Sequence, residues 1–281
     1  IRIRKYSIDL IIDLIKKANL LSGKKKSEGV YKKDFSKNEI FSNNIKLKNI
    51  SFNYGTDKKI AVNNINIEIA KGKSVGLIGK SGSGKSTLVD IIIGLLEPST
   101  GEILIDDNNI GTKKISWQKQ LGYVPQEVYL LDDTIRNNIT FGIEKEEIDE
   151  KLLSDVIEKS QLKNLVNSLT KKLDTLIGDR GARLSGGEKQ RIGIARALYN
   201  KPKVIVFDEA TSALDIYNEN KILKEIYENK KNKTLIIISH RNNTVKYCDL
   251  IYVMEDGKII DNGTFEQIMK KHSYLKEGVV T

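Results

Sequence analysis

The sequence feature that most constrains the fold is a glycine-rich stretch, GKSGSGKST, at residues 79–87. It matches the pattern G-x-x-x-x-G-K-[ST] of a P-loop, in which glycines let successive backbone N–H groups point at phosphate oxygens. An apolar segment, SVGLIG at 74–79, precedes the stretch, and the pattern after it predicts a helix over 85–96 that ends near Pro98. A strand, a glycine-rich turn and a helix in this order predict a phosphate-binding loop at a helix N-terminus.

The loop residues are expected to bind the phosphates of a nucleotide. Lys85 would reach the β- and γ-phosphates, and the hydroxyl of Ser86 would bind Mg²⁺. A chance match in a glycine-rich turn is the alternative, and the flanking strand and helix disfavour it. The residues predicted to contact the nucleotide here are Gly79, Lys80, Ser81, Gly82, Ser83, Gly84, Lys85, Ser86 and Thr87.

A second motif, VIVFDE at 204–209, carries two acids at the end of an apolar strand. Asp208 is expected to hold Mg²⁺ directly or through water. Glu209 is expected to polarise a water in line with the γ-phosphate, which makes it the candidate catalytic base. Two solvated acids at a strand end are the alternative, and this is weak beside a P-loop.

The remaining patterns predict an α/β fold. Continuous apolar runs at 203–209 and 234–240 are typical of strands buried on both faces of a parallel sheet. Alternating segments at 45–54 and 65–69 indicate strands with one exposed face, and 252–263 indicates a hairpin that turns at Asp256-Gly257. Strands that alternate with helices favour an α/β core with a parallel sheet.

Composition excludes several classes of protein. The 281 residues carry a net charge of +10. The lysines are scattered and are not interleaved with aromatic residues, so a solvated basic face is favoured over a specific nucleic-acid surface. No window approaches the roughly 18 consecutive apolar residues of a membrane span. The single cysteine, Cys248, rules out an intrachain disulfide.

Further motifs resemble those of the ABC-type ATPases, in family order over roughly residues 45–270. LSGGE at 184–188 resembles the family signature, which usually ends in Gln, and EATSALD at 209–215 resembles its D-loop. The resemblance implies that Gln126, in YVPQE, is the Q-loop glutamine, which touches Mg²⁺ or water, and that His240, in ISHR, is the switch histidine at the γ-phosphate. It also implies that Tyr54, in FNYG, stacks on the adenine.

Ser185, Gly186 and Gly187 are expected to open a helix, where their N–H groups form a second anion site. One domain with a P-loop has no evident use for such a site unless it serves another molecule's ATP. The resemblance implies that arrangement: two ATPase domains sandwich two ATP molecules head to tail, with Asp215 also at the shared site. Glu188 departs from the usual Gln, and we expect a tuned affinity and not a lost activity.

The resemblance favours the exporter branch of the family. TIRNNITFG at 134–142 and GDRGARLSGG at 178–187 are similar to exporter segments that lie where membrane domains contact the ATPase. Residues 1–21, with an amphipathic helix over 6–21, look like the end of a linker from a membrane domain, which would also explain why the chain starts with Ile1.

The resemblance implies a P-loop NTPase core, in which a mostly parallel sheet has helices on both faces, together with an antiparallel β subdomain and a helical subdomain that carries the signature. The expected organisation is an N-terminal helix at 1–21, a linker at 22–44 and an ATPase domain at 45–281, with the helical subdomain at about 127–200. The expected function is ATP-driven dimerisation that powers export, with Mg²⁺-dependent hydrolysis resetting the cycle. The expected partners are ATP, a transmembrane domain and a second copy or homologous ATPase domain, at the cytoplasmic face of the inner (plasma) membrane.

Two other classes of protein are alternatives to this hypothesis. A soluble ABC ATPase that acts on nucleic acid or ribosomes typically carries a long coiled-coil insertion or a second ATPase domain, and neither is seen. A binding module without catalysis is disfavoured because Lys85, Asp208, Glu209 and His240 are all present. The exporter motifs do not choose among peptide, lipid, lipid-linked oligosaccharide and drug as the substrate, nor between a homodimer and a heterodimer.

Overall fold

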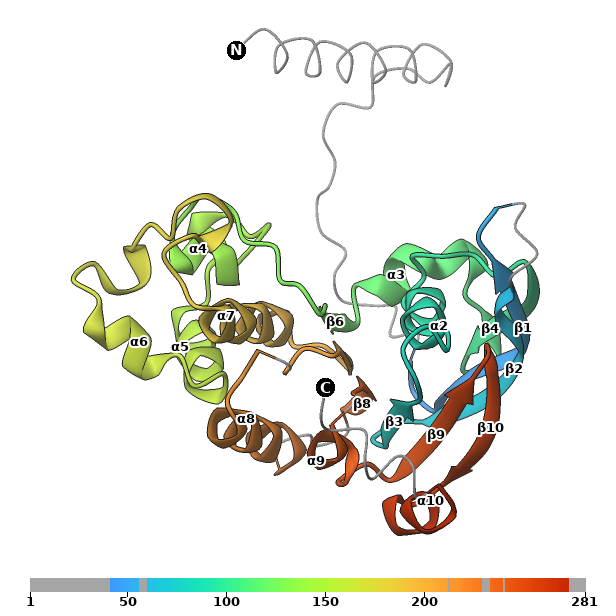
Figure 1. The fold of residues 1–281 in the computed structure, drawn as a ribbon. Coiled ribbons are helices and arrows are strands. Elements are labelled where there is room, and N and C mark those ends of the chain that lie inside the picture. Colours follow the sequence, from blue (N-terminus) through green and yellow to red (C-terminus); the bar gives the residue numbers. More distant parts are fainter. Residues whose placement is uncertain (1–40, 56–59, 212, 229–232, 240, 273–281) are drawn as a thin grey trace, which may run out of the picture. The chain divides into compact units, whose positions relative to one another are not determined.

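The computed structural model describes residues 41–55, 60–211, 213–228, 233–239 and 241–272 (Figure 1). The helix expected within residues 1–21 lies outside the described residues, as do most of the expected linker and the candidate His240. In the described part of the chain, no helix is both long and apolar enough to cross a membrane.

A small antiparallel sheet forms the first layer, in the strand order β2-β1-β4-β5. Its long strands bury alternate residues, as the alternating sequence predicts; Ile45, Leu47 and Ile50 of the first strand are buried. The strands are β1 (Asn44–Asn53), β2 (Ile60–Ala70), β4 (Thr100–Ile105) and β5 (Asn108–Asn109).

The second sheet holds the strands of the two phosphate motifs, in the order β10-β9-β3-β8-β7-β6. Neighbouring strands are parallel except in the β9–β10 hairpin, which turns at Asp256-Gly257 as predicted. The strands are β3 (Ser74–Ile78), β6 (Leu121–Val124), β7 (Val204–Asp208), β8 (Thr234–Ile238), β9 (Leu250–Glu255) and β10 (Lys258–Gly263). Each residue of β3, β7 and β8 is buried, which confirms strands covered on both faces.

Helices cover both faces of this second sheet. Along β7, Val204 and Val206 pack in one core cluster with α2 (Lys85–Ile92), while Ile205 and Phe207 pack in the other with α7 (Gly186–Tyr199) and α8 (Ile216–Glu228). The predicted α/β class with helices on both faces is confirmed.

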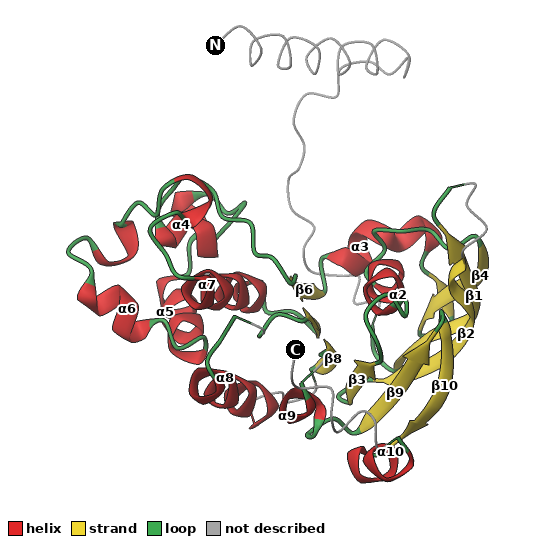
Figure 2. Cartoon of the chain, in the orientation of Figure 1, coloured by secondary structure: helices red, strands yellow, loops and turns green. Residues whose placement is uncertain are grey.

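The segment between β6 and β7 forms a group of helices, most of which lie to one side of the strands, whereas α7 also packs against the second sheet (Figure 2). It contains α4 (Ile135–Ile139), α5 (Glu150–Lys159), α6 (Lys163–Ser168) and α7. The other helices are α3 (Lys114–Gln118), α9 (Asn242–Val245) and α10 (Phe265–Lys271), and the short 3₁₀ turns are Gly111–Lys113, Lys145–Glu147, Lys172–Asp174 and Asp179–Gly181.

The helix expected over 85–96 is shorter than predicted, because α2 ends at Ile92. Gly94 follows with a φ of 74°, and its N–H donates to the carbonyl of Ile91 at 3.0 Å. A glycine in the left-handed region just after a helix terminates it. The end of the helix is therefore set by Gly94 and not by Pro98.

Candidate functional site

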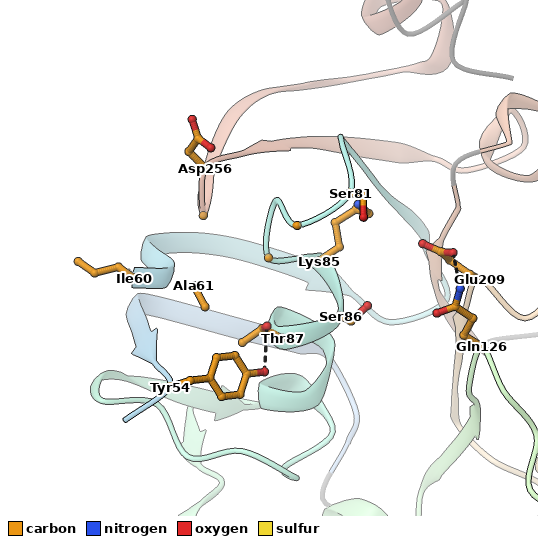
Figure 3. A pocket seen from close by; sticks show the side chains of 13 residues that line it. Tyr54, Ile60, Ala61, Ser81, Lys85, Ser86, Thr87, Gln126, Glu209 and Asp256 are labelled. Carbon is orange, nitrogen blue, oxygen red and sulfur yellow. Dashed lines mark hydrogen bonds between the residues drawn. The ribbon is translucent and has the colours of Figure 1, made fainter. Parts of the chain in front are cut away.

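A pocket with a cavity volume of about 770 Å³ lies over the P-loop (Figure 3). Nine of the predicted site residues line it: Tyr54, Ser81, Gly82, Gly84, Lys85, Ser86, Thr87, Gln126 and Glu209. Four lining residues were not predicted as part of the site: Ile60, Ala61, Asp256 and Gly257. The last two form the turn of the β9–β10 hairpin, so the sequence showed their turn but not their place in the pocket.

Two glycines of the loop are required by the close approach of other backbone segments. A Cβ on Gly79, at a φ of 149°, would lie 2.1 Å from the carbonyl oxygen of Met254. A Cβ on Gly84, at a φ of 97°, would lie 2.3 Å from the carbonyl oxygen of Ala61. The loop therefore fits between β2 and β9 only with bare backbone, which leaves its N–H groups near the pocket.

Lys85 is 5% exposed, and its ammonium group holds the loop in a curled form. The Nζ atom donates to the carbonyl oxygens of Gly79 and Lys80, both at 2.9 Å, and to Ser83 Oγ at 3.4 Å. Burial lowers the pKa of Lys85, and the nearby carboxylates of Glu209 and Asp208 oppose that shift. A cation buried at a helix N-terminus is suited to an anionic ligand such as a phosphate.

Asp208 lies at the end of β7 beside the first turn of α2. Its Oδ1 accepts a hydrogen bond from Ser86 Oγ at 3.2 Å, and its Oδ2 accepts one from the Tyr123 hydroxyl at 3.4 Å. Burial raises the pKa of Asp208, Ser86 lowers it through the hydrogen bond, and the charge of Glu209 raises it. A carboxylate and a hydroxyl in contact are hard oxygen donors of the kind that Mg²⁺ prefers.

This donor set fits the usual mode of Mg²⁺ binding in proteins. No group of three or more His, Cys, Asp or Glu residues suitable for a metal occurs within the described ranges. Mg²⁺ is commonly bound through one or two carboxylates together with waters and substrate phosphates. Ser86 and Asp208 beside the P-loop therefore fit that mode of binding.

Glu209 faces the P-loop across the pocket, and it contacts the predicted Q-loop glutamine (Figure 3). Its Oε2 accepts a hydrogen bond from Gln126 Nε2 at 3.1 Å. Its backbone has a φ of 49°, and its N–H donates to the carbonyl of Ile238 on β8 at 3.0 Å. A left-handed backbone is uncommon for glutamate, and such strain concentrates at functional sites.

Tyr54 forms part of the pocket wall and is 55% exposed. Its hydroxyl shares a hydrogen bond with Thr87 Oγ1 at 3.1 Å, and its ring stands edge-on to Phe52, with centroids 5.0 Å apart. These two contacts orient an exposed aromatic ring beside the P-loop. The ring is therefore available to a flat apolar group in the pocket.

The residues of the predicted second anion site lie at the start of α7, and they do not line this pocket. Ser185 is the N-cap, and the backbone N–H of Glu188 donates to its Oγ at 3.3 Å. Glu188 Oε2 in turn accepts from the N–H and the hydroxyl of Ser185, at 2.7 and 2.8 Å. The acid in place of the usual Gln thus completes a capping box.

Asp215 also lies away from the pocket lining, beside the start of α8. Its Oδ1 accepts from the backbone N–H of Asn218 at 3.0 Å, and its Oδ2 accepts from Asn218 Nδ2 at 2.6 Å. These hydrogen bonds with Asn218 lower the pKa of Asp215. The structure therefore brings the P-loop, Asp208, Glu209, Gln126 and Tyr54 together, and it leaves Ser185, Gly186, Gly187 and Asp215 on other surfaces.

Comparisons with known proteins agree on one family. Residues 62–212 match the ABC transporter family. The chain is 39% identical over 235 residues to ATP-binding cassette sub-family B member 5 of Mus musculus, and 40% identical over 232 residues to the alpha-hemolysin translocation ATP-binding protein HlyB of Escherichia coli O157:H7. These matches cover 83% and 82% of this chain but only 19% and 33% of the two relatives.

The fold is similar to that of a solved structure, a bacterial Atm1-family ABC exporter with ATP bound. The TM-score is 0.82 at 30% sequence identity, over 95% of this chain and 47% of that chain. The chain therefore spans less than half the length of the proteins to which it is compared.

Proposed function

The chain belongs to the ABC transporter family, whose ATP-binding domains hydrolyse ATP, and we propose that it is the ATPase domain of an exporter. The observation that carries the proposal is the pocket over the P-loop. It combines a buried cation, a pair of Mg²⁺-type oxygen ligands and a glutamate oriented by a glutamine. These are the parts that phosphoryl transfer from a nucleoside triphosphate to water requires.

In this proposal the P-loop binds the phosphates of ATP. The backbone N–H groups of residues 79–87 and the ammonium of Lys85 neutralise the phosphate charge. Tyr54, held by Thr87 and Phe52, supports the adenine from the side of the antiparallel sheet. Ser86 and Asp208 would hold Mg²⁺, which would offset the negative charge that develops during phosphoryl transfer.

Glu209 is the proposed general base. Gln126 holds its carboxylate at 3.1 Å and so fixes the direction in which it can accept a proton from water. Both side chains lie across the pocket from the P-loop, on the side where the last phosphate would lie (Figure 3). His240 remains the proposed switch residue at the γ-phosphate.

We further propose that two such domains close on two ATP molecules head to tail. Ser185, Gly186, Gly187 and Asp215 are then expected to contact the ATP in the partner's P-loop. Their position away from this chain's own pocket supports the idea, since the cap of α7 has no nucleotide to serve within the same domain. Closing the dimer would move a transmembrane domain, and hydrolysis would reopen it.

The relatives support a proposal for the membrane partner and the location. HlyB is named a translocation protein, and the Atm1-family structure is that of an exporter. We propose that this chain acts at the cytoplasmic face of the inner (plasma) membrane, attached to a transmembrane domain, which would select the substrate. The proposed organisation is an N-terminal helix at 1–21, a linker at 22–44 and an ATPase domain from residue 45 onward.

The substitution E209Q tests the proposal. It keeps the size of the side chain and the contact to Gln126 but removes the base, so we expect kcat for ATP to fall by about 10²- to 10⁴-fold. ATP affinity should stay within about threefold of the parent chain, because the phosphate ligands on the P-loop are unchanged.

The matched control is D256N. Asp256 lies on the hairpin side of the same pocket at a φ of 46°, which asparagine tolerates, so only a carboxylate is lost. We expect its kcat to stay within about twofold of the parent. Hydrolysis by the E209Q chain at the parental rate would refute the assignment of the base.

A further inference from the structure

A buried carboxylate lies outside the pocket, and the mechanism proposed above gives it no role. Glu219, in the first turn of α8, is 2% exposed. A carboxylate buried to this extent is costly unless several hydrogen bonds and a cation compensate it. Its partners therefore show what the fold uses it for.

Three side chains donate to this carboxylate. Its Oε1 accepts from the hydroxyls of Thr211 and Thr244, both at 2.7 Å. Its Oε2 accepts from Arg241 Nη1 at 2.8 Å. The donors come from two different segments. Thr211 lies in the loop after β7, and Arg241 and Thr244 follow β8, at the N-cap of α9 and within α9.

Arg241 also contacts the loop after β7 through backbone carbonyl groups. The same Nη1 atom lies within hydrogen-bonding distance of the carbonyl oxygens of Thr211, at 3.4 Å, and Leu214, at 3.3 Å. Its backbone N–H donates to Ser239 Oγ at 2.9 Å. In the sequence, Leu214 directly precedes Asp215, and Ser239 and Arg241 are the neighbours of His240.

The same loop is held from the side of the signature helix. Gln190 of α7, which is 4% exposed, accepts a hydrogen bond from the backbone N–H of Ala213 at 3.1 Å. Its Nε2 lies 3.5 Å from the carbonyl oxygen of Gln126. The loop after β7 is thus fastened at Thr211, Ala213 and Leu214, to groups from three other parts of the chain.

We propose that Glu219 is a positioning residue for ATP hydrolysis. Through Arg241, Thr211 and Thr244 it keeps the loop that begins at Glu209 in register with the segment that follows β8. This proposal rests on the proposed function. Glu219 makes no contact with ATP in it, so its loss should lower kcat and leave nucleotide binding unchanged. A misplacement of about 1 Å in a reacting group lowers the rate by up to about 10²-fold. Loss of the hydrogen bonds around Glu219 can therefore lower the rate of hydrolysis without removing a catalytic group.

The test is steady-state ATP hydrolysis by the whole 281-residue chain carrying E219Q. We expect kcat to fall by about 10- to 100-fold, while KM and the affinity for ATP stay within about threefold. The chain with both E219Q and R241Q should lose no more than the worse single variant, because the two residues act as one unit. Additive losses, or a kcat within twofold of the parent for E219Q, would overturn the proposal.

Two controls separate positioning from lost stability. E228Q makes the same chemical change at an exposed ion pair with Lys224 on the same helix, and it should leave kcat unchanged. L223A opens a cavity under α8 at a residue that is 1% exposed; it should lower Tm but leave kcat within twofold. A loss of kcat in L223A equal to that in E219Q would make the effect one of stability and sink the proposal.

If E219Q does not fold, T244V tests the positioning role instead, because it removes one hydroxyl that donates to Glu219 at nearly constant side-chain volume. A severalfold lower kcat at an unchanged ATP affinity would support positioning, and a parental kcat would refute it. A different result would refute the proposed function: a parent chain that does not hydrolyse ATP. An active parent with equally active E219Q and T244V chains removes only the role of Glu219.

Discussion

The substitution K85M tests the phosphate-binding loop most directly. It keeps most of the length and apolar volume of the side chain but removes the ammonium that bonds to the carbonyls of Gly79 and Lys80. Burial lowers the pKa of Lys85, which shows that the charge is held there at a cost. Relief from that cost offsets part of the lost hydrogen bonding, so we expect the unfolding free energy to change by no more than about 1 kcal/mol.

The effect on nucleotide binding should be much larger. A hydrogen bond between charged groups contributes about 1.5–3 kcal/mol. One such contact to the β- and γ-phosphates therefore corresponds to a rise in Kd for Mg-ATP of about 10- to 150-fold. Binding of AMP, which lacks those phosphates, should change by less than about threefold by the same reasoning.

Isothermal titration with Mg-ATP and with AMP measures both effects. The matched control is K80M, which removes an equal charge from the same loop. The Lys80 side chain is 73% exposed, and its Nζ lies 3.9 Å from Glu255 at the surface. We expect K80M to change Kd for Mg-ATP by less than about threefold. A Kd for K85M within twofold of the parent, or an equal loss in K80M, would refute a direct contact between Lys85 and the phosphates.

Two further predictions concern α7. E188Q should keep the capping box but remove a negative charge from the site proposed to contact the partner's ATP. The ATP concentration that gives half-maximal dimerisation should therefore fall by about two- to fivefold. Light scattering over an ATP titration measures this, and a higher ATP requirement would contradict it. G193A would place a Cβ 2.6 Å from Val128 Cγ2, which overpacks the core and should lower the unfolding free energy by about 1–2 kcal/mol. Urea unfolding measures the loss; V128A should restore part of it, and no rescue would refute the steric cause.

Local patterns in the sequence predicted the parts of the site that local structure builds. The P-loop and the N-cap at Ser185 each depend on a few neighbouring residues, and so does the turn at Asp256-Gly257, where φ is positive at both positions. Such features follow from backbone conformation and short hydrogen bonds. They can therefore be found without knowledge of the rest of the fold.

Local sequence patterns could not predict contacts between distant segments of the chain. The hydrogen bond between Gln126 and Glu209 joins residues 83 positions apart, and the pocket wall at Ala61 depends on how β2 packs against the loop. Glu219 gave no signal in the sequence, because an acid in the first turn of a helix is ordinarily exposed and favourable there. Only the packing of two segments around it makes its carboxylate buried.

The place of β3 in its sheet has a consequence for synthesis. This strand, which leads into the P-loop, pairs on one side with β8 and on the other with β9, so both of its neighbours are made late. At 5–20 residues per second, a ribosome needs roughly 10–30 s to proceed from β3 to β9, about 170 residues later. During that interval the nascent P-loop lacks the backbone of Met254 against which Gly79 packs. The pocket wall formed by Asp256 and Gly257 is therefore made last, whereas the antiparallel sheet is already complete at Asn109.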